Sequence, residues 1–230
     1  SRLETFSHNA NDNLVMFSRK GRVPRGAWVE NGDIIIDIGK GKQRICSSQD
    51  LFILGKHNLE NALAAAAIAG LMEVDADIIS RVLKDFRGVE HRIEYVDTID
   101  GVEFYNDSKG TNPDAAIKAI EAMKGPTIII AGGMDEGASF DHFIDAFGDR
   151  VVHMVVLGET ADELMRAAEE KGFLNVHRVD SIEEAVSKAF SLAHRGENIL
   201  LSPACASWDM FTSYEERGEV FKEAVESLRR

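Results

Sequence analysis

The sequence predicts an α/β protein with two parts. Residues 1–90 are expected to form an α/β portion with a small β-meander, and residues 91–230 a mostly parallel sheet with helices on both faces. The first part begins with short runs rich in Val, Ile and Phe that turn residues separate, which is typical of a meander. In the second part strand patterns alternate with helix patterns, and such repeated βα units indicate a parallel sheet. The pattern changes between Gly88 and Glu94, so we expect the boundary there.

The expected elements of residues 1–90 are four strands and two helices. Asn31-Gly32, between the second and third strands, is the pair typical of a tight hairpin. The first helix is rich in Ala and apolar on most sides, which predicts that it is buried. The strands are Leu14–Ser18, Ala27–Glu30, Asp33–Ile38 and Gln43–Ser47, and the helices are Asn58–Val74 and Asp75–Phe86.

The elements expected beyond residue 91 alternate strand and helix after a first pair of strands. An Ile-Asp-Gly turn separates that first pair. The expected strands are Ile93–Thr98, Val102–Asn106, Thr127–Ala131, Val151–Leu157, Asn175–Arg178 and Asn198–Ser202. The expected helices are one from Pro113, then Ser139–Phe147, Ala161–Lys171, Ile182–His194 and a last helix towards Arg230.

Composition and charge exclude several classes of protein. Of 230 residues, 44% are hydrophobic and 28% are charged, and the net charge is -13. Such an acidic chain is not expected to bind nucleic acid generally or to adhere to an anionic membrane, because both need a basic patch. No apolar run approaches the ~20 residues that a membrane span requires, and no signal peptide is recognised.

The cysteines and the start of the chain suggest where it comes from. Cys46 and Cys205 lie far apart and form no CxxC motif, so we interpret them as reduced thiols of a cytoplasmic protein. The chain begins at Ser1 without a methionine and without a clear first element. We therefore expect it to be a piece of a longer protein.

One stretch, where a strand ends and a helix begins, organises the second part. Asn112 is a good N-cap and Pro113 suits the first helical position. The free N–H groups and positive dipole end of this helix, with Lys109 just before them, favour an anion such as a phosphate or carboxylate. Asp107 could hold a ribose hydroxyl or a metal-bound water. The alternative is a capped helix whose Lys and Asp are solvated surface charges.

Other polar or small residues follow the remaining strands, and ligands of parallel sheets bind at such carboxyl ends. They are Gly132-Gly133-Met134-Asp135, Gly158-Glu159 and the run from Ser202 to Ser207. The glycines do not form GxGxxG, which argues against a dehydrogenase. Cys205 has no catalytic His nearby in sequence, so a structural thiol is the favoured interpretation. The histidines form no HExxH pattern, and we expect no residue of this chain to ligate a metal.

Two further sites carry open alternatives. Asn58 and Asn61 are three residues apart, so both amides share one helix face, where they could bind the edge of an adenine ring. Alternatively, Asn58 caps the helix. Arg92 could stack on a base or hold a phosphate, or it could form a salt bridge with Glu94 at the domain boundary.

Taken together, these segments resemble the Mur ligases, the ATP-dependent amino-acid ligases of peptidoglycan precursor synthesis. Two of the matching runs are specific to the branch that adds D-glutamate to UDP-MurNAc-L-alanine, namely Asp-Ser-Lys-x-Thr-Asn and Ser-Pro-Ala-Cys-Ala-Ser. The matching segments are His57–Asn61, His91–Glu94, Asn106–Asn112, Gly132-Gly133 with Asp135 and Gly137, Leu201–Phe211 and Glu216–Gly218.

The resemblance implies a Rossmann-like C-terminal domain, preceded by the end of an ATP-binding central domain, and ATP and Mg²⁺ as cofactors. In that family the two domains close on the nucleotide, and a substrate carboxylate forms an acyl phosphate that the amino acid's amine attacks. It implies that Lys109 reaches the terminal phosphate as the catalytic residue. Adenine, base and ribose contacts would come from Asn58, Asn61, Arg92 and Asp107, and the amino-acid site from Thr111, Ser207, Phe211 and Tyr214.

The chain departs from the family pattern in three ways. It has no Gly-Lys-Thr/Ser phosphate loop and no uridine-nucleotide domain, so we expect it to be the second half of such an enzyme and inactive alone. Glu136 stands where the D-glutamate branch usually has a Lys. The carboxylate of Glu136 would repel an acidic amino acid. Gly110 replaces the usual Ala and is expected to loosen the helix entry. The alternatives are a Mur or folylpolyglutamate-type ligase with another amino acid, or a non-catalytic binding module.

Overall fold

A computed structural model describes residues 14–229 of the chain. The chain divides between Arg87 and Gly88 into two compact units, unit 1 and unit 2, and each is described by itself. No helix among the described residues has both the length and the hydropathy to cross a membrane.

Unit 1 contains a four-stranded sheet in the order β1-β2-β3-β4. Only the last three strands form the expected antiparallel meander, because β1 pairs with β2 in parallel, and the prediction is wrong for this strand. The hairpin between β2 and β3 is confirmed, since Asn31 and Gly32 both have positive φ, 53° and 86°. The strands are Met16–Ser18 (β1), Gly26–Glu30 (β2), Asp33–Asp37 (β3) and Gln43–Ser47 (β4), followed by the 3₁₀ turn Ser48–Asp50 (η1).

Helices α2 (Lys56–Leu71) and α3 (Ala76–Asp85) pack with this sheet around one apolar core. The core takes only one face of α2, which includes Leu63 and Ala66. The expectation of a helix buried on most sides is therefore wrong: Ile68 is 61% exposed. Ala has a high helix propensity without needing burial, which explains why composition misled here.

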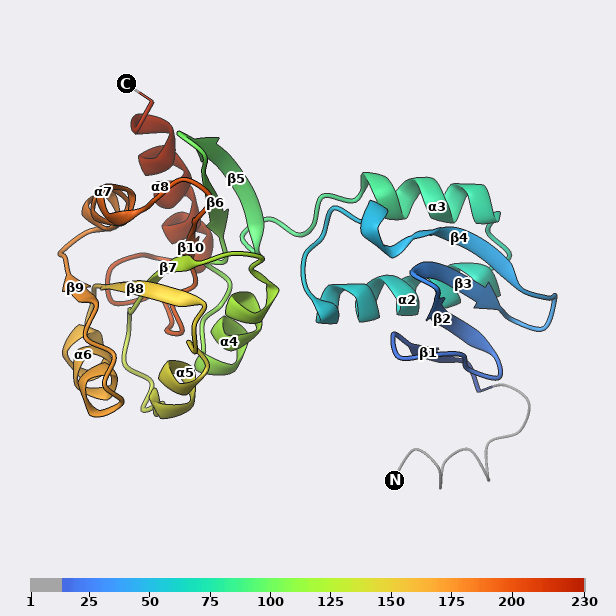
Figure 1. The fold of residues 1–230 in the computed structure, drawn as a ribbon, viewed down its shortest axis with the longest axis horizontal. Helices are drawn as coiled ribbons and strands as arrows, with labels where there is room; N and C mark the ends of the chain where they lie inside the picture. The colour runs from blue at the N-terminus through green and yellow to red at the C-terminus, as the bar shows by residue number, and fades with distance from the viewer. Residues whose placement is uncertain (1–13, 230) are drawn as a thin grey trace. The chain divides into compact units, whose positions relative to one another are not determined.

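Unit 2 contains a six-stranded sheet in the order β5-β6-β10-β7-β8-β9 (Figure 1). β5 is antiparallel to β6 and all other neighbours are parallel, which confirms the predicted mostly parallel sheet. The strands are Glu94–Ile99 (β5), Val102–Asn106 (β6), Thr127–Ala131 (β7), Val151–Val156 (β8), Val176–Arg178 (β9) and Asn198–Leu201 (β10).

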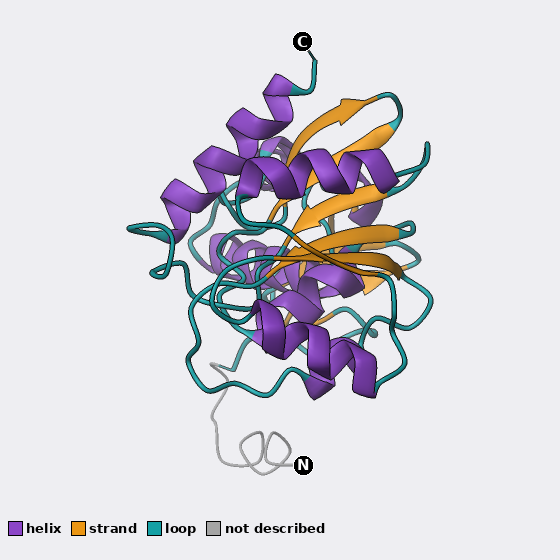
Figure 2. Ribbon diagram, turned by 90° about the vertical axis from the view of Figure 1, so that its left-hand side faces the viewer, coloured by secondary structure: helices purple, strands orange, loops and turns teal. Residues whose placement is uncertain are grey.

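Helices cover both faces of this sheet, as the sequence predicted (Figures 1 and 2). Residues of α7 and α8 share a core with one set of strand side chains, among them Ile128 and Ile130. The alternate residue Ile129 is also fully buried and, because strand side chains alternate, points to the opposite face, where α4, α5 and α6 lie. The helices are Pro113–Ala122 (α4), Asp141–Asp145 (α5), Ala161–Glu170 (α6), Ile182–Leu192 (α7) and Tyr214–Ser227 (α8).

The order of the strands creates a switch point at β6 and β10. The chain leaves β6 for α4 on one face of the sheet and leaves the neighbouring β10 for α8 on the other. Loops that diverge in this way leave a crevice at the carboxyl ends of the strands, where ligands of such sheets bind.

Candidate functional site

The loops that follow β6, β10 and β7 are joined by backbone hydrogen bonds at the switch point. Ala204 N donates to Gly110 O (2.9 Å), and Gly132 N donates to Pro203 O (2.8 Å). Gly132, at φ 114°, has no room for a side chain, because a Cβ would lie 2.0 Å from Leu157 O. The small residues that follow these strands therefore allow close contact between loops.

Asp107 is the most unusual carboxylate of unit 2. It is buried, and its oxygens accept hydrogen bonds from Ile93 N (3.2 Å) and from Ser202 Oγ (2.7 Å). Burial raises the pKa of Asp107 to about 7, against the opposing effects of Ser202, Ile93 N and two arginines. Asp107 is therefore not the solvated surface charge of the alternative reading.

Gly110 faces this carboxylate directly. A Cβ on Gly110 would lie 2.5 Å from Asp107 Oδ2 and 2.8 Å from Ser202 Oγ. Gly110 N also donates to Asp107 O (2.7 Å). The expectation that glycine loosens the helix entry is thus wrong, because the Asp107–Ser202 pair fills the space of the missing methyl group.

Lys109 lies against Tyr214, the first residue of α8. Its Nζ donates to Tyr214 Oη (2.9 Å) and lies 4.2 Å from the centroid of the ring. No ion pair within residues 14–229 includes Lys109, so its charge stays available to an anion. The predicted Asn112 cap is confirmed, since its side chain accepts from Ala115 N (2.9 Å).

Arg217 connects the loops after β6 and β10 from within the core. Only 2% exposed, it donates to Ser108 Oγ (3.0 Å), Ser108 O (2.9 Å), Cys205 O (3.1 Å) and Ala206 O (3.1 Å). Burial lowers the pKa of Arg217 to about 10. Arg217 falls within one of the runs that resemble the family, but the sequence predicts no role for it, because two of its acceptors belong to Ser108, 109 positions away.

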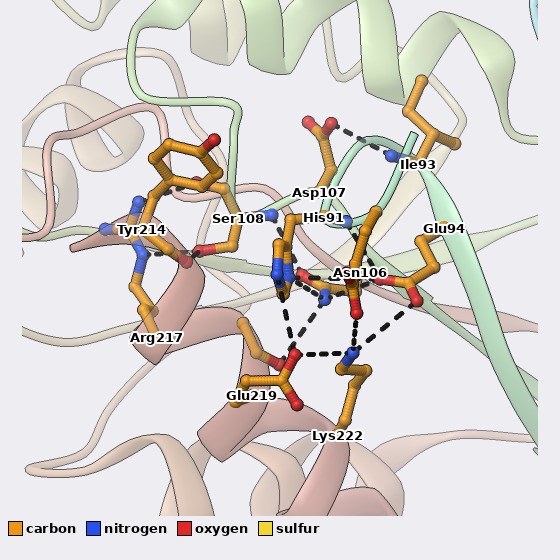
Figure 3. A network of polar contacts seen from close by, with 12 residues as sticks. His91, Ile93, Glu94, Asn106, Asp107, Ser108, Tyr214, Arg217, Glu219 and Lys222 are labelled. Atoms are coloured by element: carbon orange, nitrogen blue, oxygen red, sulfur yellow. Dashed lines mark hydrogen bonds and ion pairs between the residues drawn. The ribbon is translucent and has the colours of Figure 1, made fainter. Parts of the chain in front are cut away.

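A second polar network joins the start of unit 2 to β6 (Figure 3). Ser108 N donates to Asn106 Oδ1 (3.1 Å), so Asn106 Nδ2 faces His91 Nδ1 (3.0 Å) and Glu94 Oε2 (3.1 Å). Since an amide nitrogen only donates, His91 Nδ1 accepts and the ring proton sits on Nε2. Gly218 leaves room for this ring, because a Cβ there would lie 2.3 Å from His91 Nδ1.

Arg92 is exposed, and hydrogen bonds hold the backbone of the residue on either side of it. Lys109 N donates to His91 O (3.0 Å), and Ile93 N donates to Asp107. Both His91 and Ile93 have positive φ, 61° and 46°. The alternative of an Arg92–Glu94 salt bridge is wrong, because Glu94 instead accepts from His91 N (2.9 Å) and Asn106.

The predicted amino-acid-site residues lie on the same loops but in different environments. Thr111 is half-buried at the start of α4, and its N donates to Lys109 O (2.9 Å). Ser207 is buried within the loop between β10 and α8. Phe211 packs against the core of unit 2, so its ring supports this loop. Cys205 is buried, and burial raises the pKa of its thiol to about 11, which fits a structural thiol.

The loops after β7, β8 and β10 form an acidic rim. Asp135 N donates to Glu159 Oε2 (3.1 Å), and Glu159 N donates to Asp209 Oδ2 (3.1 Å). Glu136 is exposed beside Asp135. Glu136, which departs from the family pattern, thus follows a residue of this acidic rim in the sequence.

Asn58 and Asn61 lie on α2 in unit 1. Asn61 Nδ2 donates to Asn58 Oδ1 (3.4 Å), so the two amides share a face as predicted. Asn58 Nδ2 donates to Leu54 O (2.7 Å). Capping by Asn58 is wrong, because the helix begins after Gly55, which provides no side-chain cap.

Only one group of three possible metal ligands occurs within residues 14–229, and it consists of Glu90, His91 and Glu219. Lys222 Nζ already lies 2.7 Å from carboxylate oxygens of Glu90 and Glu219. Lys222 thus already pairs with both carboxylates of this group, and the described residues offer no fitting ligand set of their own for Mg²⁺.

The fold is that of an α/β domain whose sheet has a switch point between β6 and β10, and Asp107 and Lys109 lie in the loop after β6. A family model described as "Mur ligase, glutamate ligase domain" matches residues 91–205, half of the chain, and the chain belongs to this family.

Relatives named UDP-N-acetylmuramoylalanine--D-glutamate ligase match nearly the whole chain. The one from Alkaliphilus oremlandii is 53% identical and covers 94% of this chain, and that from Thermoanaerobacter sp. (strain X514) is 47% identical and covers 98%. The matches take up 48% and 50% of those proteins, so the chain spans about half their length.

Solved structures agree on the fold. UDP-N-acetylmuramate-alanine ligase MurC from Thermotoga maritima has a TM-score of 0.65 at 17% identity, with 98% of this chain and 50% of that chain covered. Folylpolyglutamate synthase of Mycobacterium tuberculosis has a TM-score of 0.59 at 16% identity, with 85% and 46% covered.

Proposed function

We propose that the chain is the part of an ATP-dependent ligase that joins D-glutamate to UDP-MurNAc-L-alanine in peptidoglycan precursor synthesis. The observation that carries the proposal is the identity of 45–53% over nearly the whole chain with relatives that bear this name. The geometry supports it, because unit 2 gathers at one switch point the buried carboxylate of Asp107 and Lys109, which has no ion-pair partner among residues 14–229.

In the proposed reaction the substrate carboxylate attacks the γ-phosphorus of ATP and releases ADP. The resulting acyl phosphate is attacked by the amine of D-glutamate, which releases phosphate, and the amine's proton passes to solvent. This route needs a cation near the transferring phosphoryl group, because negative charge spreads over its oxygens. Lys109, just before the N-terminal end of α4, takes this role.

The placement of each residue supports the proposed nucleotide contacts. The amides of Asn58 and Asn61 are proposed to bind the adenine edge, since together they present donors and acceptors on one helix face. Arg92 is exposed and free to stack on the base. Asp107 accepts from the ribose hydroxyls, and its pKa of about 7 makes this contact stronger above pH 7.

The incoming amino acid is proposed to bind near Thr111, Ser207, Phe211 and Tyr214. Of these, Tyr214 contacts the Lys109 ammonium. An ammonium at this position would attract a carboxylate of D-glutamate. Glu136 and the acidic rim favour one second candidate, a ligase of the same type whose acceptor amino acid is not acidic.

Mg²⁺ would supply charge neutralisation at the phosphates and be held by those phosphates and by parts of the enzyme outside this chain, because the described residues offer no ligand set that fits it. The proposal includes a cytoplasmic location, where ATP is available. It also makes the remaining half of the enzyme, with its phosphate loop, the partner of this chain.

Phosphate release by the full-length protein tests the proposal. With ATP, Mg²⁺ and UDP-MurNAc-L-alanine, we expect release that depends on D-glutamate and a product heavier by one glutamyl residue. Release with D-lysine but not D-glutamate would establish the second candidate instead, and no release with either amino acid would refute both. The 230-residue chain alone is the matched control and is expected to be inactive.

A further inference from the structure

Lys109 and Tyr214 form a contact between residues 105 positions apart in the sequence. Lys109 lies in the loop after β6, and Tyr214 begins α8. The tyrosine itself is fixed from two directions. Its backbone O accepts from Ser108 Oγ (2.7 Å), and its ring meets the His91 ring edge-on at 6.1 Å between centroids. Tyr214 therefore offers Lys109 a rigid support.

The partner of Lys109 is neutral, in contrast to that of Lys222. Lys222 has three carboxylates within 4 Å, at 2.7, 2.7 and 3.7 Å. One acidic neighbour of the Lys109–Tyr214 pair is Glu215, whose pKa is lowered first by a hydrogen bond from Tyr214 and also by the charge of Lys109. Glu215 forms no ion pair with Lys109 in the described part of the chain. A phenol thus orients the ammonium, and within residues 14–229 the ammonium forms no ion pair with a carboxylate.

We propose that Tyr214 is a positioning residue for Lys109. The hydroxyl holds the ammonium near the N-terminal end of α4 and keeps it available to an anionic oxygen of the substrate. This inference rests on the proposed function, in which Lys109 approaches the transferring phosphoryl group.

Steady-state kinetics of the full-length protein test the inference with Tyr214→Phe, which keeps the ring and removes only the hydroxyl. We expect kcat to fall by about tenfold or more, as for the loss of one hydrogen bond to a charged group, with little change in the KM for ATP. Tyr95→Phe is the matched control, because the hydroxyl it removes has a single hydrogen-bond partner among the described residues, Thr98 Oγ1 (2.8 Å) on the β5 hairpin. An unchanged kcat in Tyr214→Phe would overturn the inference.

A double-mutant cycle separates positioning from a structural role. If Tyr214 acts through Lys109, Tyr214→Phe costs nothing further in a Lys109→Gln background. An equal loss in both backgrounds would show that the hydroxyl acts elsewhere and would refute the inference.

A readout without turnover keeps the inference testable if the proposed function fails. If wild-type protein shows no substrate-dependent phosphate release, the proposed function is refuted, but the contact between Lys109 and Tyr214 is not. The ¹⁵Nζ NMR signal of Lys109 in the 230-residue chain, assigned with Lys109→Gln, is expected to be slowed in proton exchange and to lose this protection in Tyr214→Phe. Equal exchange in the two proteins would refute the contact itself.

Discussion

Replacing Asp107 by asparagine separates the charge of this buried side chain from its hydrogen bonds. In the Asp107→Asn variant the amide oxygen would still accept from Ile93 N, and the NH₂ group would donate to Ser202 Oγ, which can accept as well as donate. The variant therefore keeps the local contacts and removes a titrating group.

The pKa of Asp107 sets the size and the sign of the effect. Its value is about 7 in the folded protein against an ordinary 3.8, so protonation stabilises the folded state. This contribution is fully present below pH 3.8 and is lost as the pH rises through 7. At 1.36 kcal/mol for each pH unit between the two values, the total is about 4 kcal/mol, of which about 2 kcal/mol is lost between about pH 5.5 and about pH 8.5.

Urea titrations followed by the amide NMR signals of β10 measure this in unit 2. Relative to wild type, Asp107→Asn is expected to gain about 2 kcal/mol of unfolding free energy between about pH 5.5 and about pH 8.5. Asp180→Asn, which changes an exposed carboxylate, is the control and should follow wild type. A difference between Asp107→Asn and wild type that is the same at both pH values would refute the reasoning.

Four further substitutions test the site. Gly110→Ala places a Cβ 2.5 Å from Asp107 Oδ2, so we expect a loss of about 1–3 kcal/mol in unfolding free energy and weaker ADP binding by calorimetry; unchanged values would contradict the packing. Arg217→Met removes four donors to buried acceptors and should destabilise unit 2 by about 3 kcal/mol or more in urea, whereas a small effect would mean that water replaces them. Asn61→Ala should raise the KM for ATP in the full-length protein by about fivefold, with kcat kept, and a pure loss of kcat would argue against adenine binding. Glu136→Lys should lower the KM for D-glutamate by about tenfold, and no change would show that residue 136 does not face the amino acid.

Local patterns in the sequence predicted most of the fold. Val102–Asn106, Thr127–Ala131 and Gln43–Ser47 were predicted with the bounds that the structure has, because apolar runs of strand length end at clear turn residues. The Asn112 cap was also predicted, since capping depends on neighbouring residues only.

The errors concern features that depend on partners distant in the sequence. Composition does not reveal which side of α2 lacks a neighbour, so the exposure of Ile68 was missed. The parallel pairing of Met16–Ser18 with β2 cannot be read from a strand pattern, because parallel and antiparallel strands share it.

The candidate site was predicted in part. Asp107 and Lys109 were chosen because they end a strand of a parallel sheet, and the structure brings both to the switch point. The contacts of Arg217 and the His91–Asn106 pair join residues up to 109 positions apart, and no spacing rule predicts such contacts. The Arg92–Glu94 alternative failed because Glu94 is engaged by backbone and amide donors.

The last strand of the chain to be made occupies the middle of its sheet. β10 pairs with β6 on one side and β7 on the other, so Leu200 lies between Tyr105 and Ile129. During translation, β6 and β7 therefore have no common neighbour until residue 201 has left the ribosome. Until then, the edges of β6 and β7 that will pair with β10 stay unpaired in the nascent domain. A nonsense codon shortly before Asn198 would thus remove the centre of the sheet and not merely its margin.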